Sequence, residues 1–310
     1  MKILSKKISI LAISVLMFIL EIRCSQSPTE PILDLEDEAS MVPWSKITGK
    51  IAYSRYDSQS DGYLFLIDGS TRKVNLVRKG TREMFTNLAW STDGKKIIYS
   101  DFDYTRYRWQ LYRINSDGNS QSIIYSTDAH NNYPAYSQDG RLAYWYNGLH
   151  NTYEIWINEV SFFGKAGCDQ TRPAWSPDNK YLVISPRDST SQGALYKVSL
   201  SDTSFTPLIQ GSGGNQEIFH SPIYSPDGSK IAFVKWGPGL GGLSEIWIMN
   251  SDGTNPLRLT SGHKDWCPAW SLDGQKITFE RDSKIYIMNS DGNDITQVTK
   301  NFGSYPIWTP

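Results

Sequence analysis

The sequence predicts an all-β fold, a six-bladed β-propeller of four-stranded antiparallel blades. Three observations lead to this prediction. Aromatic residues make up 13% of the 310 residues, with 11 Trp, 18 Tyr, 24 Gly and 15 Pro, a composition typical of short strands joined by tight turns. A motif recurs at a period close to that of propeller blades. The sequence also ends a few residues into one more copy of that motif.

The motif begins with a short strand that ends in an aromatic residue. Five copies are "NLAWSTDGKKIIYS" (87–100), "YPAYSQDGRLAYWY" (133–146), "RPAWSPDNKYLVIS" (172–185), "SPIYSPDGSKIAFV" (221–234) and "CPAWSLDGQKITFE" (267–280), and "SYPIWTP" (304–310) is the sixth. The aromatic anchors are Trp90, Tyr136, Trp175, Tyr224, Trp270 and Trp308, at spacings of 46, 39, 49, 46 and 38 residues. A unit of this length accommodates the four strands of a blade.

A tight turn follows each of the first five anchors, with Ser, a variable residue, Asp, and then Gly or Asn. An Asp in a turn accepts hydrogen bonds from backbone groups just ahead of it, so we interpret the repeated Asp as turn chemistry and not as catalysis. The Asp residues are Asp93, Asp139, Asp178, Asp227 and Asp273. The residues after them are Gly94, Gly140, Asn179, Gly228 and Gly274, for which we expect left-handed backbone conformations.

The second, third and fourth strands of each blade come after this turn. Third strands include "WQLYRIN", "SEIWIMN" and "SKIYIMN", and each of these three continues into the hairpin turn "NSDG". Residues 50–77 supply strands two to four of a blade that has no first strand, so residues 304–310 are expected to complete it and close the ring. The expected blades are 47–83 plus 304–310, 84–129, 130–168, 169–217, 218–262 and 263–303.

The segment before residue 47 is expected to lie outside the propeller. Three lysines precede an apolar run over residues 8–20, which indicates a signal peptide over residues 1–23. Cys24 follows in a position that resembles the acylated cysteine of bacterial lipoproteins, although Arg23 stands where a small residue is usual. We expect lipidation at Cys24, and ordinary secretion is the alternative. Residues 24–46, rich in Ser, Pro and acidic residues, are expected to be a flexible tether.

The net charge bears on the kind of partner, and the cysteine content bears on metal binding and disulfides. The formal net charge is −1 and no basic stripe occurs, which argues against nucleic acid, because phosphate binding requires clustered Lys and Arg. A membrane is expected to be contacted only through the N-terminal lipid, and we expect a monomer. Cys168 and Cys267 form no metal or disulfide pattern, and whether they pair with each other is left open.

The repeat "PAWSPDG…KIAF…EIWIMNSDG…LT" resembles that of the TolB-like propellers, a family of WD-repeat-like propellers of the periplasm and envelope. The resemblance covers residues 47–310, without the α/β domain that precedes the propeller in TolB. It implies localisation in the periplasm or at the outer membrane. It also implies a non-catalytic role in binding or scaffolding, with a protein or glycan of the bacterial envelope received at one mouth of the central channel.

We expect the binding surface on the loops that precede the innermost strands. These loops gather around one mouth of a propeller, and function concentrates on loops held by a rigid scaffold. The candidate residues are Arg82, Phe85, His130, Asp169, Arg172, Glu217, Phe219, His220, His263, Asp265, Trp266 and Phe302. Aromatic residues and Arg carry most of the binding energy in many interfaces.

Enzyme motifs give little support for catalysis. "GPGLGG" (237–242) precedes a strand instead of the helix that a dinucleotide site requires, and no nucleophile elbow, P-loop or zinc-protease motif occurs. No catalytic residues and no cofactor are therefore expected. The alternative function is a metal-dependent polysaccharide lyase or hydrolase that uses the channel, with a metal held by His130, His220 and His263.

Overall fold

The computed structural model describes residues 34–57, 61–125, 128–148, 153–164, 172–186, 193–211 and 217–309. The expected signal peptide, Cys24, Cys168 and Asp169 lie outside these residues. Within the described part of the chain, none of the helices is long and apolar enough to cross a membrane.

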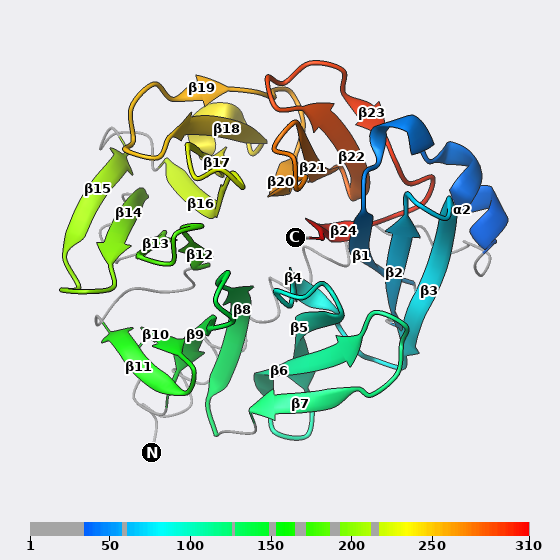
Figure 1. Ribbon diagram of the computed structural model, residues 1–310, viewed down its shortest axis with the longest axis horizontal. Coiled ribbons are helices and arrows are strands. Elements are labelled where there is room, and N and C mark those ends of the chain that lie inside the picture. The colour runs from blue at the N-terminus through cyan, green and yellow to red at the C-terminus, as the bar shows by residue number, and fades with distance from the viewer. Residues whose placement is uncertain are drawn as a thin grey trace, which may run out of the picture.

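Six four-stranded antiparallel sheets surround a central axis and form the six blades (Figure 1). Blade 1 contains β24 (Ser304–Trp308), β1 (Lys50–Tyr56), β2 (Gly62–Asp68) and β3 (Lys73–Gly80), and blade 2 contains β4 (Thr86–Trp90), β5 (Lys96–Asp103), β6 (Arg108–Asn115) and β7 (Ser122–Tyr125). Blade 3 contains β8 (His130–Tyr136), β9 (Leu142–Asn147), β10 (Tyr153–Ile157) and β11 (Val160–Gly164). The predicted fold class is confirmed.

The remaining three blades repeat the same order. Blade 4 contains β12 (Ala174–Trp175), β13 (Tyr181–Ile184), β14 (Ala194–Ser199) and β15 (Phe205–Gln210). Blade 5 contains β16 (Ile218–Tyr224), β17 (Lys230–Trp236), β18 (Ser244–Asn250) and β19 (Leu257–Arg258), with a 3₁₀ turn η2 (Pro238–Leu240) between β17 and β18. Blade 6 contains β20 (Asp265–Trp270), β21 (Lys276–Arg281), β22 (Lys284–Asn289) and β23 (Thr296–Gln297).

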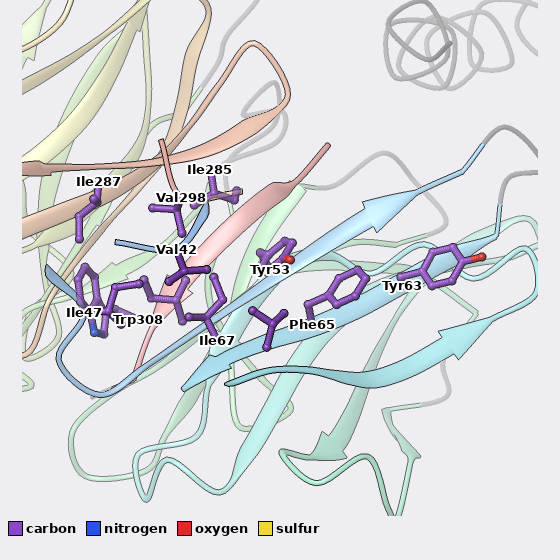
Figure 2. Close-up of a cluster of buried hydrophobic side chains, with 12 residues drawn as sticks. Val42, Ile47, Tyr53, Tyr63, Phe65, Ile67, Ile285, Ile287, Val298 and Trp308 are labelled. Atoms are coloured by element: carbon purple, nitrogen blue, oxygen red, sulfur yellow. The ribbon is translucent and has the colours of Figure 1, made fainter. Parts of the chain in front are cut away.

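The C-terminal strand closes the ring as expected. β24 pairs antiparallel with β1, with Ala52 opposite Ile307. Trp308 lies in an apolar cluster shared by blades 1 and 6, which also contains Phe65 and Ile285 (Figure 2). Because both sheet edges at this seam are used, neither is left as a template for another chain.

The hydrophobic core lies mainly between neighbouring blades. One apolar cluster joins blades 1 and 2, and others join blades 2 and 3, 3 and 4, 4 and 5, and 5 and 6. The anchor side chains add buried apolar area to these layers, and indole groups among them also form hydrogen bonds to the preceding blade. The indole N–H of Trp175 donates to Ala135 O in the preceding blade at 3.0 Å, and that of Trp270 donates to Ile223 O at 3.4 Å. The repeated Trp therefore joins one blade to the next.

The repeated Ser-x-Asp-Gly turns have the geometry that their sequence predicts. In blade 5, the Ser225 hydroxyl donates to Asp227 Oδ1 at 2.6 Å, and Ser229 N donates to the same oxygen at 3.0 Å. These hydrogen bonds lower the pKa of Asp227. Positive φ occurs at the five expected positions, Gly94, Gly140, Asn179, Gly228 and Gly274. The Asp residues are thus committed to the turns.

The expectation of a flexible tether over residues 24–46 is wrong for its second half. Residues of this segment form the helix α2 (Leu35–Met41) and the 3₁₀ turn η1 (Trp44–Lys46), with Asp34 as the N-cap. The Glu38 carboxylate is buried, with 3% exposure, and accepts hydrogen bonds from the backbone N–H groups of Lys300 and Asn301. The acidic composition suggested disorder, but one of the acidic residues, Glu38, is hydrogen-bonded to the loop that follows blade 6.

Candidate functional site

The innermost strands share a backbone irregularity three residues before the anchor. Five residues there have positive φ without being glycine: Asn87, Tyr133, Ser221, Cys267 and Tyr305, with φ between 50° and 54°. The strand register shifts beside all five of them, in β4, β8, β16, β20 and β24. The sixth equivalent residue is Arg172, in the segment before β12. A bulge of this kind redirects a side chain, and here it recurs around the channel.

A cavity of about 240 Å³ occupies the channel between this ring and the Ser-x-Asp turns. Its walls are the ends of the innermost strands, with the Pro, Ala and aromatic residues of the motif, such as Pro173, Ala174 and Trp175. Its rim is made by turn residues, among them Thr92, Gln138, Pro177, Pro226 and Leu272. Leu272 is 62% exposed, an unusual position for a large apolar side chain. The cavity therefore opens at the mouth opposite the one that the sequence favoured.

Arg172 is the charged residue in this lining. The other described residues of the lining are apolar or neutral, and they include neither a carboxylate nor an imidazole. The Arg172 guanidinium donates from Nη2 to Leu88 O, in blade 2, at 3.4 Å, and it also hydrogen-bonds the Cys267 side chain, in blade 6. One side chain from blade 4 thus reaches residues of two non-adjacent blades across the channel.

Cys267, which contacts Arg172, has two larger polar side chains near it, Glu280 and Tyr305. Burial raises the pKa of the Cys267 thiol to about 12, and Arg172 acts in the opposite direction. Burial also raises the pKa of Glu280 to about 7, although Tyr305 N donates to its carboxylate. Burial raises the pKa of Tyr305 well above its usual value, and the neighbouring Cys267, Glu280 and Tyr133 act in the same direction.

Several residues expected on the binding surface are buried instead. Phe85 is fully buried between blades 1 and 2, and Phe219 packs between blades 4 and 5 in a T-shaped contact with Phe233. Asp265 is also fully buried and forms a bidentate ion pair with Arg281, at 2.7 and 2.8 Å. For these three the prediction of a binding surface is wrong, because aromatic side chains and ion pairs in the segments before the innermost strands also serve blade packing.

Other expected residues remain accessible at that mouth. Arg82 is exposed, and Phe302 is half-buried. Trp266 and His220 are half-buried and stack on each other, with ring centroids 4.8 Å apart. The remaining expected residue here, Glu217, forms an ion pair with Lys235 at 2.7 Å.

The structure does not bring the three candidate metal ligands together. His130 Nδ1 accepts from Trp109 N at 3.2 Å, His220 stacks on Trp266, and His263 is exposed and bonded to Asp282 at 2.9 Å. Among the described residues, no three His, Cys, Asp or Glu side chains are grouped so that they could hold a metal ion. The three histidines fail to converge because they lie on different blades at different distances from their anchors.

Of the expected residues that the structure describes, Arg172 is the one that contacts the cavity. Sequence reasoning assigned the Pro-Ala-aromatic segments to the fold alone and so missed the rest of the lining. The sequence did contain a signal for this lining, since Pro and Ala recur just before the anchor and indicate small side chains that face a common axis.

Comparison with known proteins supports the fold and leaves the role open. No family model matches the chain. A segment of 99 residues is 34% identical to the Tol-Pal system protein TolB of Anaeromyxobacter dehalogenans, which covers 32% of this chain and 21% of that protein. An uncharacterized protein of Agrobacterium fabrum is 26% identical over 271 residues, with 77% of this chain and 86% of that protein covered.

Among solved structures, TolB from Acinetobacter baumannii has a TM-score of 0.71 at 22% identity, over 84% of this chain and 67% of that one. The sequence match to the curated TolB relatives spans only about a fifth of their length. This chain is a six-bladed β-propeller that resembles TolB in fold and, over 99 residues, in sequence.

Proposed function

We propose that this protein is a non-catalytic binding propeller of the cell envelope, and that its channel cavity receives an extended segment of a partner protein. The supporting observation is the lining, a ring of Pro, Ala, Trp and Tyr side chains in which Arg172 alone is charged. An apolar concave surface with a few polar groups is the usual form of a binding site. Acid–base catalysis would need a titratable group within reach of a substrate, and this lining has no carboxylate or imidazole.

The size of the cavity favours a short segment over a folded domain. At about 240 Å³ it is slightly smaller than the roughly 300 Å³ at which small-ligand pockets begin. A few side chains fit this space, while the rim turns would contact the flanking surface of the partner. Leu272, exposed on the rim, is the residue that such a contact would cover.

The envelope assignment depends on the resemblance to TolB, on the expected signal peptide and on the expected lipidation of Cys24. We propose that the propeller lies in the periplasm and is held at a membrane by its N-terminus. Because the relatives include a protein of the Tol-Pal system, an envelope protein is the partner class that we favour over a glycan.

Cross-linking in intact cells tests this proposal. A photoreactive amino acid replaces Leu272 at the rim or, as a control of similar exposure, Leu257 on the outer strand β19. We expect a specific envelope protein to be cross-linked at position 272 and not at 257, and Leu272→Asp to weaken recovery of that partner about tenfold or more. Equal labelling from both positions would contradict the proposal.

A further inference from the structure

We propose that Arg172 is the anchor of the channel site and that it binds a carboxylate of the partner, so that the segment received is acidic or ends in a free C-terminus. This inference rests on the proposed function and specifies the chemistry of the ligand. It begins with the position of Arg172, which lines the deep end of the cavity together with Ser221, at the level of the ring.

The charge of Arg172 has no ion-pair partner in the described residues, although the buried carboxyl group of Glu280 lies close enough to Cys267, its neighbour, to add to the effect of burial in raising the pKa of that thiol. Arginine keeps its positive charge in proteins. The ion pairs of the described residues do not include Arg172, whereas Arg55, Arg78, Arg141 and Arg281 are paired with carboxylates. A half-buried cation in an otherwise neutral cavity has lost part of its hydration. An anionic ligand is favoured there, because an ion pair with it compensates for that loss.

The hydrogen bonds of Arg172 hold the side chain in place and leave capacity for a ligand. The bond to Leu88 O is long, at 3.4 Å, and the other acceptor is a thiol, which accepts weakly. Toward the described residues, only these two hydrogen bonds engage the guanidinium. A planar guanidinium presents such donors in a fork that matches the two oxygens of a carboxylate.

The neutral walls make Arg172 the determinant of specificity. Contacts with the Pro, Ala and aromatic side chains of the walls give affinity but discriminate little between peptides. With Arg172 as the charged group in the lining, an acidic ligand gains an ion pair, while a basic one meets a like charge.

A peptide array tests the inference with the full-length protein. Set one contains random nonapeptides that lack Asp and Glu and have an amidated C-terminus. Set two adds one central Asp, and set three instead has a free C-terminal carboxylate. A fourth surface carries oligomers of a uronic acid, which present the same carboxylate on a glycan. The variants are Arg172→Met, Arg172→Lys and the matched control Arg113→Met, in which an exposed arginine on β6, outside the cavity lining, is changed.

We expect wild-type retention on set two or set three to exceed that on set one by about tenfold, and the excess identifies a side-chain or a terminal carboxylate as the ligand. Arg172→Met should abolish the excess, Arg172→Lys should keep part of it, and Arg113→Met should behave as wild type. The unfolding midpoint of each variant is measured first, and Arg172→Lys, which conserves the charge, replaces Arg172→Met if the latter does not fold.

Three outcomes would overturn the inference. Equal retention on sets one, two and three would show peptide binding without a carboxylate anchor and would leave the proposed function standing. An unchanged excess in Arg172→Met would place the anchor elsewhere. Retention on the uronic acid surface alone would make the ligand a glycan, and it would count against both proposals.

Discussion

The buried carboxylate of Glu38 is expected to fasten the N-terminal helix α2 to the loop that follows blade 6. It accepts hydrogen bonds from Lys300 N at 3.0 Å, Asn301 N at 3.3 Å and Asn301 Nδ2 at 2.7 Å, and it lies 3.6 Å from Arg55 Nη1. The contact bridges more than 260 residues of sequence at the seam where the ring closes. Glu38→Ala removes the common acceptor of all three donors.

The loss can be estimated from these contacts. A buried donor left without its acceptor costs about 1–3 kcal/mol, and the three sites here are partly buried and can recruit water. We expect Glu38→Ala to lower the free energy of unfolding by about 2–4 kcal/mol, which corresponds to about 5–10 °C in Tm for a chain of this size.

Urea unfolding monitored by tryptophan fluorescence measures this change. Glu36→Ala is the control, because Glu36 is an exposed acid in the first turn of the same helix and should contribute only about 0.3–1 kcal/mol. If Glu38→Ala is no more destabilising than Glu36→Ala, α2 does not stabilise the closed ring and the reasoning fails.

Two further predictions concern closure and pH. Trp308→Ala should lower the free energy of unfolding by about 3–5 kcal/mol and speed hydrogen exchange in β1, since the indole fills the cluster between blades 1 and 6. The control Val160→Ala, at an exposed site, should change the free energy of urea unfolding by no more than about 0.5 kcal/mol. Burial raises the pKa of Glu280 to about 7, so the folded protein binds more protons than the unfolded one, and stability should fall as pH rises from about 4.3 to 7. Glu280→Gln should flatten this slope. Part of the pH dependence should remain, because burial also raises the pKa of Asp101 to about 7. Identical slopes in both proteins would contradict the assignment.

Much of the fold was predictable because the repeat is local. Each copy carries its own turn chemistry and strand alternation, so the six anchors and the shared first blade could be inferred before any contact was known. The left-handed residue after each turn Asp was predictable for the same reason, since Gly and Asn tolerate that conformation.

The candidate site was less predictable, because it depends on which ends of six strands converge. Phe85 and Asp265 looked like binding residues by type, but their burial between blades and against Arg281 is set by neighbours distant in sequence. The bulge before each anchor also arises from strand pairing, and no residue type marks it, since Asn, Tyr, Ser and Cys all occupy it.

By itself, the sequence determined the blade period, the turns and the identity of the closing strand, all of which follow from the residues of one or two adjacent strands. Tertiary structure alone decided that the cavity lies at the turn side, that Arg172 reaches residues of blades 2 and 6, and that Glu38 binds a loop at the other end of the chain. The physical reason is that these features arise where segments of different blades meet across the axis or the seam. A hydrogen bond between such segments depends on the closed geometry of the ring, and no local pattern encodes it.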